Sequence, residues 1–169
     1  MSRALRAIPI AILVFIVYIV YTGSATIYDI VTGFFAAALA GLITANITVE
    51  KPFKALNPAR WLWGLAYAVY YFFVAEVKAH LDVTRRILSP SMPLNPGIVR
   101  IPYDLETAYG ITAVANSITN TPGTVVVDIN PSKKVFYVHW IDVKSLDPEE
   151  CRKHISAAFE RFARRVFEG

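Results

Sequence analysis

Cysteine and glutamine are what this sequence has least of: Cys151 is the only cysteine among 169 residues, and there is no glutamine. A single cysteine excludes a disulfide within the chain, which suits a reducing compartment. The lack of glutamine, a thermolabile residue, is compatible with a thermophilic source. Neither absence points to catalysis, and we interpret Cys151 as a packed structural side chain.

Signatures of catalysis and of bound groups are also missing. The sequence has no glycine-rich phosphate loop, no cysteine pair at metal-binding spacing and no His-Glu-x-x-His motif. His80, His139 and His154 fall in three different predicted elements, and His139 alternates with Tyr137 and Ile141 as a packed strand residue does. The sequence therefore predicts no catalytic residue, no bound metal and no cofactor.

Charged residues are scarce in the first part of the chain. Hydrophobic residues make up 55% of the sequence, the mean hydropathy is +0.44, and residues 8–21 and 27–47 are nearly uninterrupted apolar runs. Each run is close to the ~20 residues that span the ~30 Å hydrocarbon core of a bilayer. We predict a transmembrane helical hairpin at residues 1–48. The alternative, a signal peptide cleaved near Ala25, is disfavoured by the second run that follows at once.

Ionisable side chains are almost absent from the two apolar runs. Asp29, near the start of the second run, is the exception. Ion pathways need ionisable groups at membrane depth, so this chain alone is a poor candidate for moving protons or sodium ions. The net charge of +4 is modest. In a membrane protein it reflects basic residues that face the cytoplasm rather than nucleic-acid binding.

Basic residues flank the predicted hairpin on both sides and are missing from the loop at residues 22–28. These residues are Arg3, Arg6, Lys51, Lys54 and Arg60. Because basic residues favour the cytoplasmic side of a membrane, both ends of the hairpin are predicted to be cytoplasmic.

Residues 49–96 leave two interpretations open. The apolar run 61–77 is long enough to form a third membrane span. The interpretation that we favour is a helix in the plane of the membrane surface, because a third crossing would put basic residues on the wrong side. Residues 89–96 are rich in proline and form a linker.

Two sets of side chains support the in-plane interpretation. One is a stripe with helical spacing, and the other is a group of aromatic rings that favour the headgroup level. The stripe comprises Tyr70, Val74, Val77, Leu81, Thr84 and Leu88. The rings are Trp61, Trp63, Tyr67, Tyr70 and Tyr71.

Residues 97–169 predict a small cytoplasmic α+β domain of order β-α-β-β-α. A strand at 98–103, a helix capped by Asp104, strands at 124–129 and 135–143, and a helix that starts at Asp147-Pro148 follow in turn. Helices cover only one face of such a sheet, so the second face is a candidate partner surface. Phe136, Val138 and Trp140 face one way, and Tyr137, His139 and Ile141 face the other.

The junction at residues 116–129 joins the first of these helices to a strand. Pro122-Gly123 forces a tight reversal, and three threonines offer hydroxyls that cap the helix end and the turn. These are Thr119, Thr121 and Thr124. Asn116 and Ser117 either do the same or meet a neighbouring subunit.

The same stretch carries a resemblance to a known family. Its pattern is Asn116-Ser117-Ile118-Thr119, Thr121-Pro122-Gly123-Thr124, Val127-Asp128, Tyr137-Val138-His139 and Asp142-Val143. With these residues the chain resembles the E subunits of the multisubunit Mrp/Mnh cation–proton antiporter family over nearly its whole length. Asn120 and Trp140 depart from the family's usual pattern. They indicate a divergent branch such as the similar subunits of archaeal membrane-bound hydrogenases and sulfane reductases.

The resemblance implies a non-catalytic structural or assembly subunit of a complex that exchanges Na⁺ for protons. Its partners would be the other subunits of the antiporter module and the lipid bilayer. Its location would be the cell membrane, with several spans and a cytoplasmic C-terminal domain. A stand-alone membrane-anchored module that recruits a cytoplasmic partner is the alternative hypothesis.

Two groups of residues are candidates for roles in such a complex. The predicted subunit interface comprises Gly33, Ala37, Gly41, Asn116, Ser117 and Trp140, the first three because small residues let membrane helices approach closely. Glu76 and Asp82 are candidates to lie beside a cytoplasmic ion-access route of a neighbouring subunit.

Overall fold

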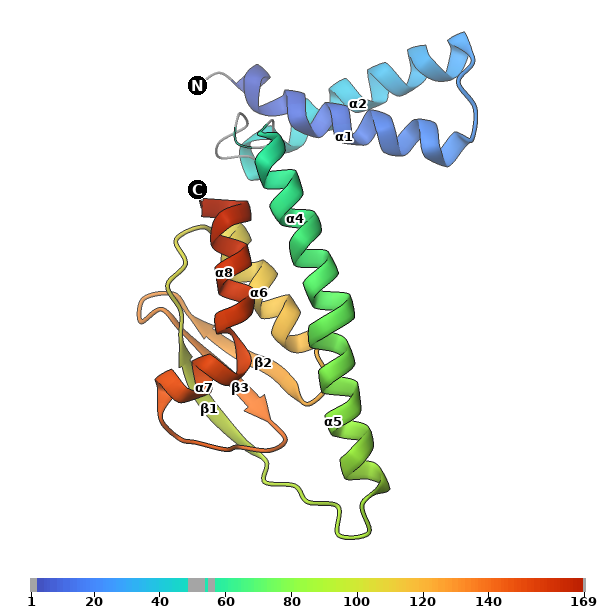
Figure 1. Cartoon of the computed structure of the whole chain (residues 1–169). Coiled ribbons are helices and arrows are strands. Elements are labelled where there is room, and N and C mark those ends of the chain that lie inside the picture. The colour runs from blue at the N-terminus through green and yellow to red at the C-terminus, as the bar shows by residue number, and fades with distance from the viewer. Residues whose placement is uncertain (1–2, 49–53, 55–56, 169) are drawn as a thin grey trace. The chain divides into compact units, whose positions relative to one another are not determined.

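The computed structural model describes residues 3–48, 54 and 57–168. The chain divides into two compact units, Met1–Pro58 and Ala59–Gly169 (Figure 1). The first is a pair of helices. The second is a long helix together with a small mixed domain that contains a three-stranded sheet.

The first unit consists of α1 (Arg3–Thr22) and α2 (Ile27–Thr48), which pack against each other along their lengths. Ile27–Ala45 is long and apolar enough to cross a membrane, and the apolar segment Arg6–Thr22 is shorter. The first turn of α2 forms a capping box. The Asp29 carboxylate accepts a hydrogen bond from the Thr26 N–H at 3.2 Å, and the Thr26 hydroxyl accepts one from the Asp29 N–H at 3.3 Å.

The second unit starts with a continuous helix made of three segments: α4 (Pro58–Tyr70), the π-helical turn η1 (Tyr71–Ala75) and α5 (Glu76–Leu88). A π turn inserts one extra residue, so every side chain that follows is rotated by about 100° relative to an uninterrupted α-helix. This rotation decides which side chains after residue 75 share a face with those before it.

The sheet is formed by β1 (Gly97–Pro102), β2 (Thr124–Asn130) and β3 (Val135–Trp140) in the order β1-β3-β2, with β3 antiparallel to both neighbours. Helix α6 (Ala108–Asn120) connects β1 to β2 and lies on one face. Alternate residues of β3 are buried on that face, as predicted. The buried ones are Phe136, Val138 and Trp140.

The chain ends in α7 (Pro148–Ile155), α8 (Ala157–Ala163) and the π turn η2 (Arg164–Glu168). The predicted start is confirmed: Pro148 occupies the first turn, and the Asp147 carboxylate accepts a hydrogen bond from the Glu150 N–H at 2.9 Å. The predicted single helix is wrong because it breaks at Ser156. Ser156 is fully buried, and its hydroxyl donates to the Glu160 carboxylate at 2.7 Å.

One predicted cap is also wrong. Thr107, not Asp104, caps α6, because the Thr107 hydroxyl accepts the Gly110 N–H at 3.1 Å. Asp104 instead pairs with Arg164, sixty residues further along the chain. The βαββα order is otherwise as predicted.

Candidate subunit interface

The small residues of α2 that are predicted to lie at a subunit interface pack between the two helices of the hairpin. Ala37 is only 3% exposed. A Cβ atom added to Gly41 would lie 2.8 Å from the Ala7 carbonyl oxygen, and one added to Gly33 would lie 2.6 Å from the Tyr18 ring. The physical reason is that close approach of α1 and α2 already uses this stripe.

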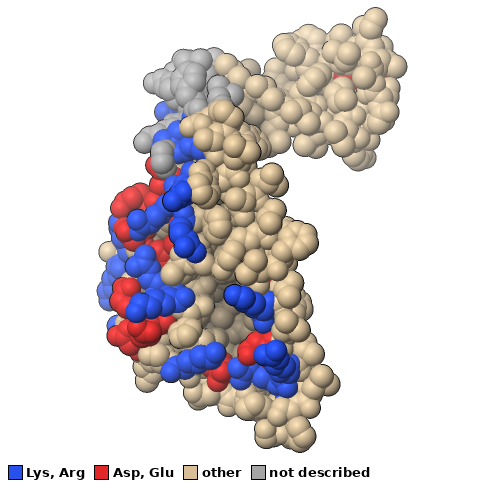
Figure 2. All heavy atoms as spheres, in the orientation of Figure 1, with Lys and Arg blue, Asp and Glu red and all other residues tan. Residues whose placement is uncertain are grey.

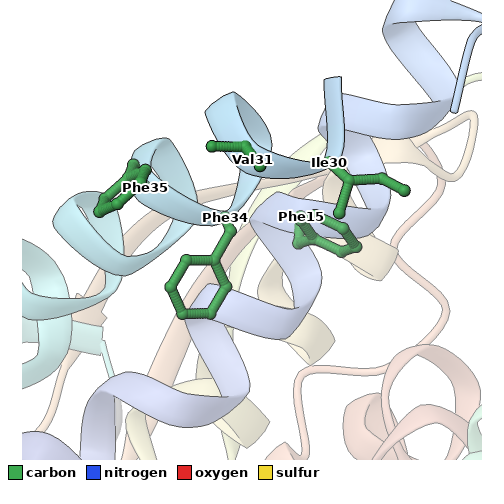
Figure 3. A pocket seen from close by; sticks show the side chains of 5 residues that line it. All are labelled: Phe15, Ile30, Val31, Phe34 and Phe35. Carbon is green, nitrogen blue, oxygen red and sulfur yellow. The ribbon is translucent and has the colours of Figure 1, made fainter. Parts of the chain in front are cut away.

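The outward surface of the hairpin is made of large apolar side chains. Phe34 and Phe35 are both more than 60% exposed, and the hairpin surface in Figure 2 is almost free of charge. A wholly apolar groove of about 270 Å³ lies on it, lined by Phe15 of α1 and by Ile30, Val31 and the two phenylalanines of α2 (Figure 3). Such a surface suits hydrocarbon rather than water.

The acid predicted as the one ionisable group near the spans is engaged locally. Asp29 accepts hydrogen bonds from the Ser24 hydroxyl at 2.7 Å and the Thr26 hydroxyl at 2.6 Å, in addition to its capping bond. All of these partners lie at the start of α2. Asp29 therefore serves the helix terminus, as an acid in a first turn does.

Hydroxyl groups hold the junction between α6 and β2, as predicted. The Thr121 hydroxyl donates to the Ser117 carbonyl at 2.6 Å, and the Thr124 hydroxyl donates to the Ile118 carbonyl at 2.7 Å. The Thr119 hydroxyl accepts the Val126 N–H at 3.2 Å. These bonds fix one path of the backbone through the turn.

Ser117, predicted at a subunit interface, is engaged inside the chain. Its hydroxyl lies 2.6 Å from the Tyr67 hydroxyl of α4. Burial raises the pKa of Tyr67 to about 12, and the bond with Ser117 partly opposes that shift. The junction therefore docks the long helix onto the sheet domain.

Asn116 has a different environment. It is exposed and lines a groove of about 430 Å³ together with Ala115, Thr119 and residues 126–129 of β2. The pairing of β2 with β3 shifts between Val126 and Asp128, which marks a β-bulge in the wall of this groove. The groove is open to a neighbouring molecule, whereas the Val126 and Ile129 N–H groups already bond to side chains of this chain.

Trp140, the last residue of the predicted interface, is mostly buried within this chain. It is 9% exposed and lies on the covered face of the sheet, with its ring centroid 5.9 Å from that of His154. Its place at a subunit interface stays a prediction. The uncovered face instead presents a row in which Ile98, His139 and Val125 are directly paired across the strands.

The tyrosines predicted at the headgroup level belong to the protein core. Tyr67 stacks on Phe162 with a centroid distance of 5.6 Å, Tyr70 packs at a tilt on the same ring at 5.1 Å, and Tyr71 packs on Phe159 at 6.1 Å. The predicted stripe is therefore wrong in its first half. Tyr70 packs against the domain core, whereas Val77 further along the helix is exposed.

Asp82 is held in a charge network. It pairs with Arg86 at 2.8 Å, and Arg86 also pairs with Asp142 at 2.7 Å and donates to the Pro93 carbonyl at 2.8 Å. The hydrogen bond from Arg86 holds the pKa of Asp82 below its usual range. This network ties α5 to the linker and to the segment after β3.

Glu76 lies where the π turn ends. Its side chain is 17% exposed, its carboxylate is 3.3 Å from His80 Nδ1, and one of its oxygens is buried without a hydrogen-bond partner. Burial, assisted by the Glu76 carboxylate, raises the pKa of Tyr71 to about 12. Within the described residues, no three His, Cys, Asp or Glu side chains gather as a metal site would require.

Glu160 has a structural role that was not predicted from the sequence. It is 2% exposed and accepts hydrogen bonds from Ser156, from Arg152 at 2.9 Å and from the Asp104 N–H at 3.2 Å. The available signal was an acid inside an apolar helical stripe with a serine four residues before it.

Comparison with known proteins identifies the family. Residues 11–166 match the family model of a Na⁺/H⁺ ion antiporter subunit. The chain belongs to this family of antiporter subunits. It is 32% identical to the E1 subunit of the Na⁺/H⁺ antiporter of Staphylococcus haemolyticus (strain JCSC1435), over 98% of this chain and 99% of that relative.

Two further proteins are similar to this chain. The E subunit of the Na⁺/H⁺ antiporter of Alkalihalophilus pseudofirmus is 35% identical over 60% of this chain, and the match spans less than two thirds, 63%, of that relative's length. A chain of the membrane-bound sulfane sulfur reductase, an archaeal respiratory membrane complex, is 37% identical with a TM-score of 0.84. That match covers 96% of this chain and 99% of the other, so this antiporter subunit has the fold of a membrane-complex subunit.

Proposed function

We propose that this chain is a non-catalytic subunit of a membrane complex that exchanges a monovalent cation, Na⁺, for protons. The observation that carries the proposal is the similarity over essentially the whole chain to an E1 subunit of an antiporter and to a chain of a respiratory membrane complex. Several of its charged side chains bind other groups of the same chain, which supports a structural role. Asp29 caps a helix, and Asp82 and Glu160 join elements of the fold.

The proposed topology is a cell-membrane protein with two spans and a cytoplasmic C-terminal domain. Arg6 lies at the start of α1 and Lys54 follows α2, which favours cytoplasmic placement of both ends. Lys51, which supports the same orientation, lies outside the described residues, as does the side chain of Arg3. The domain boundaries near 48 and 97 belong to this proposal.

The surface proposed to meet other subunits is the groove beside Asn116. It combines an exposed amide with a bulged strand, and its walls are mixed polar and apolar. The small residues of α2 and Ser117 are occupied inside the chain, so Asn116 is the member of the predicted interface that remains accessible.

The test is to purify the tagged full-length chain in mild detergent and to identify the chains that accompany it. We expect antiporter-type subunits, and the match to the sulfane reductase chain favours redox subunits beside them. Asn116→Trp should lower recovery of the complex, whereas Asn120→Trp, at the end of the same helix, serves as the matched control. A chain that purifies alone, or with one cytoplasmic protein, would support a stand-alone anchor instead.

A further inference from the structure

The long helix of the second unit has two apolar faces. The inner face contacts the domain along its length: Arg60 Nη1 donates to the Val166 carbonyl at 3.0 Å, Tyr67 meets Ser117, and Arg86 pairs with Asp142. The opposite face, here called the outer stripe, carries large apolar side chains that are at least half exposed. The outer stripe comprises Trp61, Leu62, Leu65, Val69, Phe72 and Phe73.

The π turn brings exposed apolar residues of α5 onto the same face of the helix as the outer stripe. If the helix were α-helical throughout, Val77 and Leu81 would point away from Leu65 and Phe72. The extra residue of the π turn rotates them back by about 100°. Accordingly, Val77, Leu81 and Leu88 are all exposed. The apolar face thus extends from α4 through η1 into α5.

An exposed apolar surface of this length needs a cover other than water. In Figure 2 the surface over α4 and η1 is almost free of charge, and Lys, Arg, Asp and Glu gather on other parts of the unit. Trp61, 69% exposed, is the residue type enriched at bilayer interfaces. Lys78 and Arg85, two turns apart and both exposed, flank the stripe where anionic headgroups would meet them.

A third membrane span is incompatible with the inner face. A span would surround residues 61–77 with lipid, but Tyr67 and Tyr70 are packed on Phe162 of the domain. The same domain carries the Asp104–Arg164 ion pair, charged groups that hydrocarbon disfavours.

We propose that the outer stripe lies in the plane of the cytoplasmic membrane surface, embedded in lipid at the level of the headgroups and upper acyl chains. The chain would then rest its domain on the bilayer through one face of a helix, with the opposite face bound to the sheet domain. An interfacial helix of this kind sits about 5–10 Å into the boundary. The proposal does not depend on which complex the chain joins.

The test measures depth along the stripe by spin labelling. Single cysteines replace Leu62, Leu65, Val69 and Phe72 in turn, in the full-length chain within its purified complex, reconstituted in phosphatidylethanolamine–phosphatidylglycerol vesicles. Cys151 is fully buried, and the unsubstituted chain shows whether it takes up label. Collision with oxygen is compared with collision with a water-soluble nickel chelate. Phe35→Cys is the lipid control, and Lys133→Cys in an exposed turn is the aqueous control.

The in-plane helix predicts one shallow depth at all four positions, with more oxygen than nickel collision at each. A depth that rises and then falls from Leu62 to Phe72 would indicate a third span and overturn the proposal. Low collision with both reagents would mean that another subunit covers the stripe, which also overturns it. Nickel collision as high as at Lys133 would leave the stripe in water, with the same consequence.

Discussion

In the hairpin, the residues packed between helices are small: Ala7, Ala37 and Ala45 are buried while Phe34 and Phe35 point outward. In the C-terminal unit the arrangement is reversed. Phe136, Ile101 and Leu105 are fully buried, and Glu160 is the one charged side chain among the buried residues that the structure describes. The chain therefore contains two packing schemes: small residues are buried between the helices of the hairpin, and large apolar residues are buried in the C-terminal unit.

The two packing schemes suit different solvents. In water, burying large apolar groups drives folding. In lipid that force is absent between helices, so close backbone approach at small residues holds them together. The long helix combines both schemes, because its inner face packs aromatic rings against the domain core and its outer stripe leaves apolar groups uncovered. Variants in each region should therefore fail for different reasons.

The largest effect is expected at the buried charge of the C-terminal unit. Glu160→Ala leaves Arg152 without its partner and the Asp104 N–H without its acceptor. Removing one member of a buried ion pair costs about 3–5 kcal/mol of unfolding free energy. Denaturant titration of the full-length chain, followed by near-ultraviolet circular dichroism, measures the loss. Glu149→Ala is the control, because that exposed carboxylate lies 3.6 Å from the same arginine and should cost less than about 1 kcal/mol.

The next effect is expected in the hairpin. Gly41→Leu places a side chain against the Ala7 carbonyl and should cost about 1–3 kcal/mol through overpacking. The readout is the temperature at which the detergent-solubilised chain, free of partners, loses its monodisperse peak on size exclusion. Gly64→Leu is the matched control, since nothing lies within 4 Å of a Cβ there. If Gly41→Leu weakens only the assembled complex, the small residues of α2 form a subunit contact.

A pH effect is expected where the long helix meets the domain. Burial raises the pKa of Tyr67 to about 12 in the folded chain, whereas the pKa of an unfolded tyrosine is about 10. Its folded pKa is raised, so its stabilisation is complete below pH 10 and disappears as the pH rises toward 12. Unfolding free energy should therefore fall more steeply across that interval in the wild type than in Tyr67→Phe. Identical slopes would mean that the phenol is not buried against Ser117.

The smallest effect is expected at the surface network of α5. Asp82 is half exposed, so Asp82→Asn should cost less than about 1 kcal/mol at neutral pH. The pKa of Asp82 is lowered in the folded chain, so this contribution is lost as the pH falls through the acid range and the two proteins converge there. The measurement is the unfolding midpoint at neutral and at acid pH. A larger gap at acid pH would contradict this interpretation.

The parts that could be predicted from the sequence depend on neighbours along the chain. The helix start at Asp147-Pro148 and the hydroxyl caps around Thr121 are decided within a few residues. Asp104 was assigned wrongly as a cap because its partner, Arg164, lies sixty residues away. Small residues in α2 indicate close packing but do not say against which helix.

The π turn explains the remaining error. Spacing alone assigned Tyr70 and Val77 to the same stripe, but one inserted residue puts them on different faces. Nothing local in the run Tyr71–Ala75 marks that insertion, because every residue in it also suits an α-helix or a membrane span. The choice of faces was made by packing on Phe159 and Phe162, which follow about 90 residues later.

We infer that this chain supports an ion-exchanging complex without carrying the ion. The most direct measurement is Na⁺-driven proton movement in vesicles, per assembled complex, with wild-type chain and with Asp29→Asn. Asparagine retains the capping oxygen and removes the charge, so the rate per complex is predicted to stay unchanged. An intact complex that loses exchange would contradict the claim and make Asp29 part of the ion path.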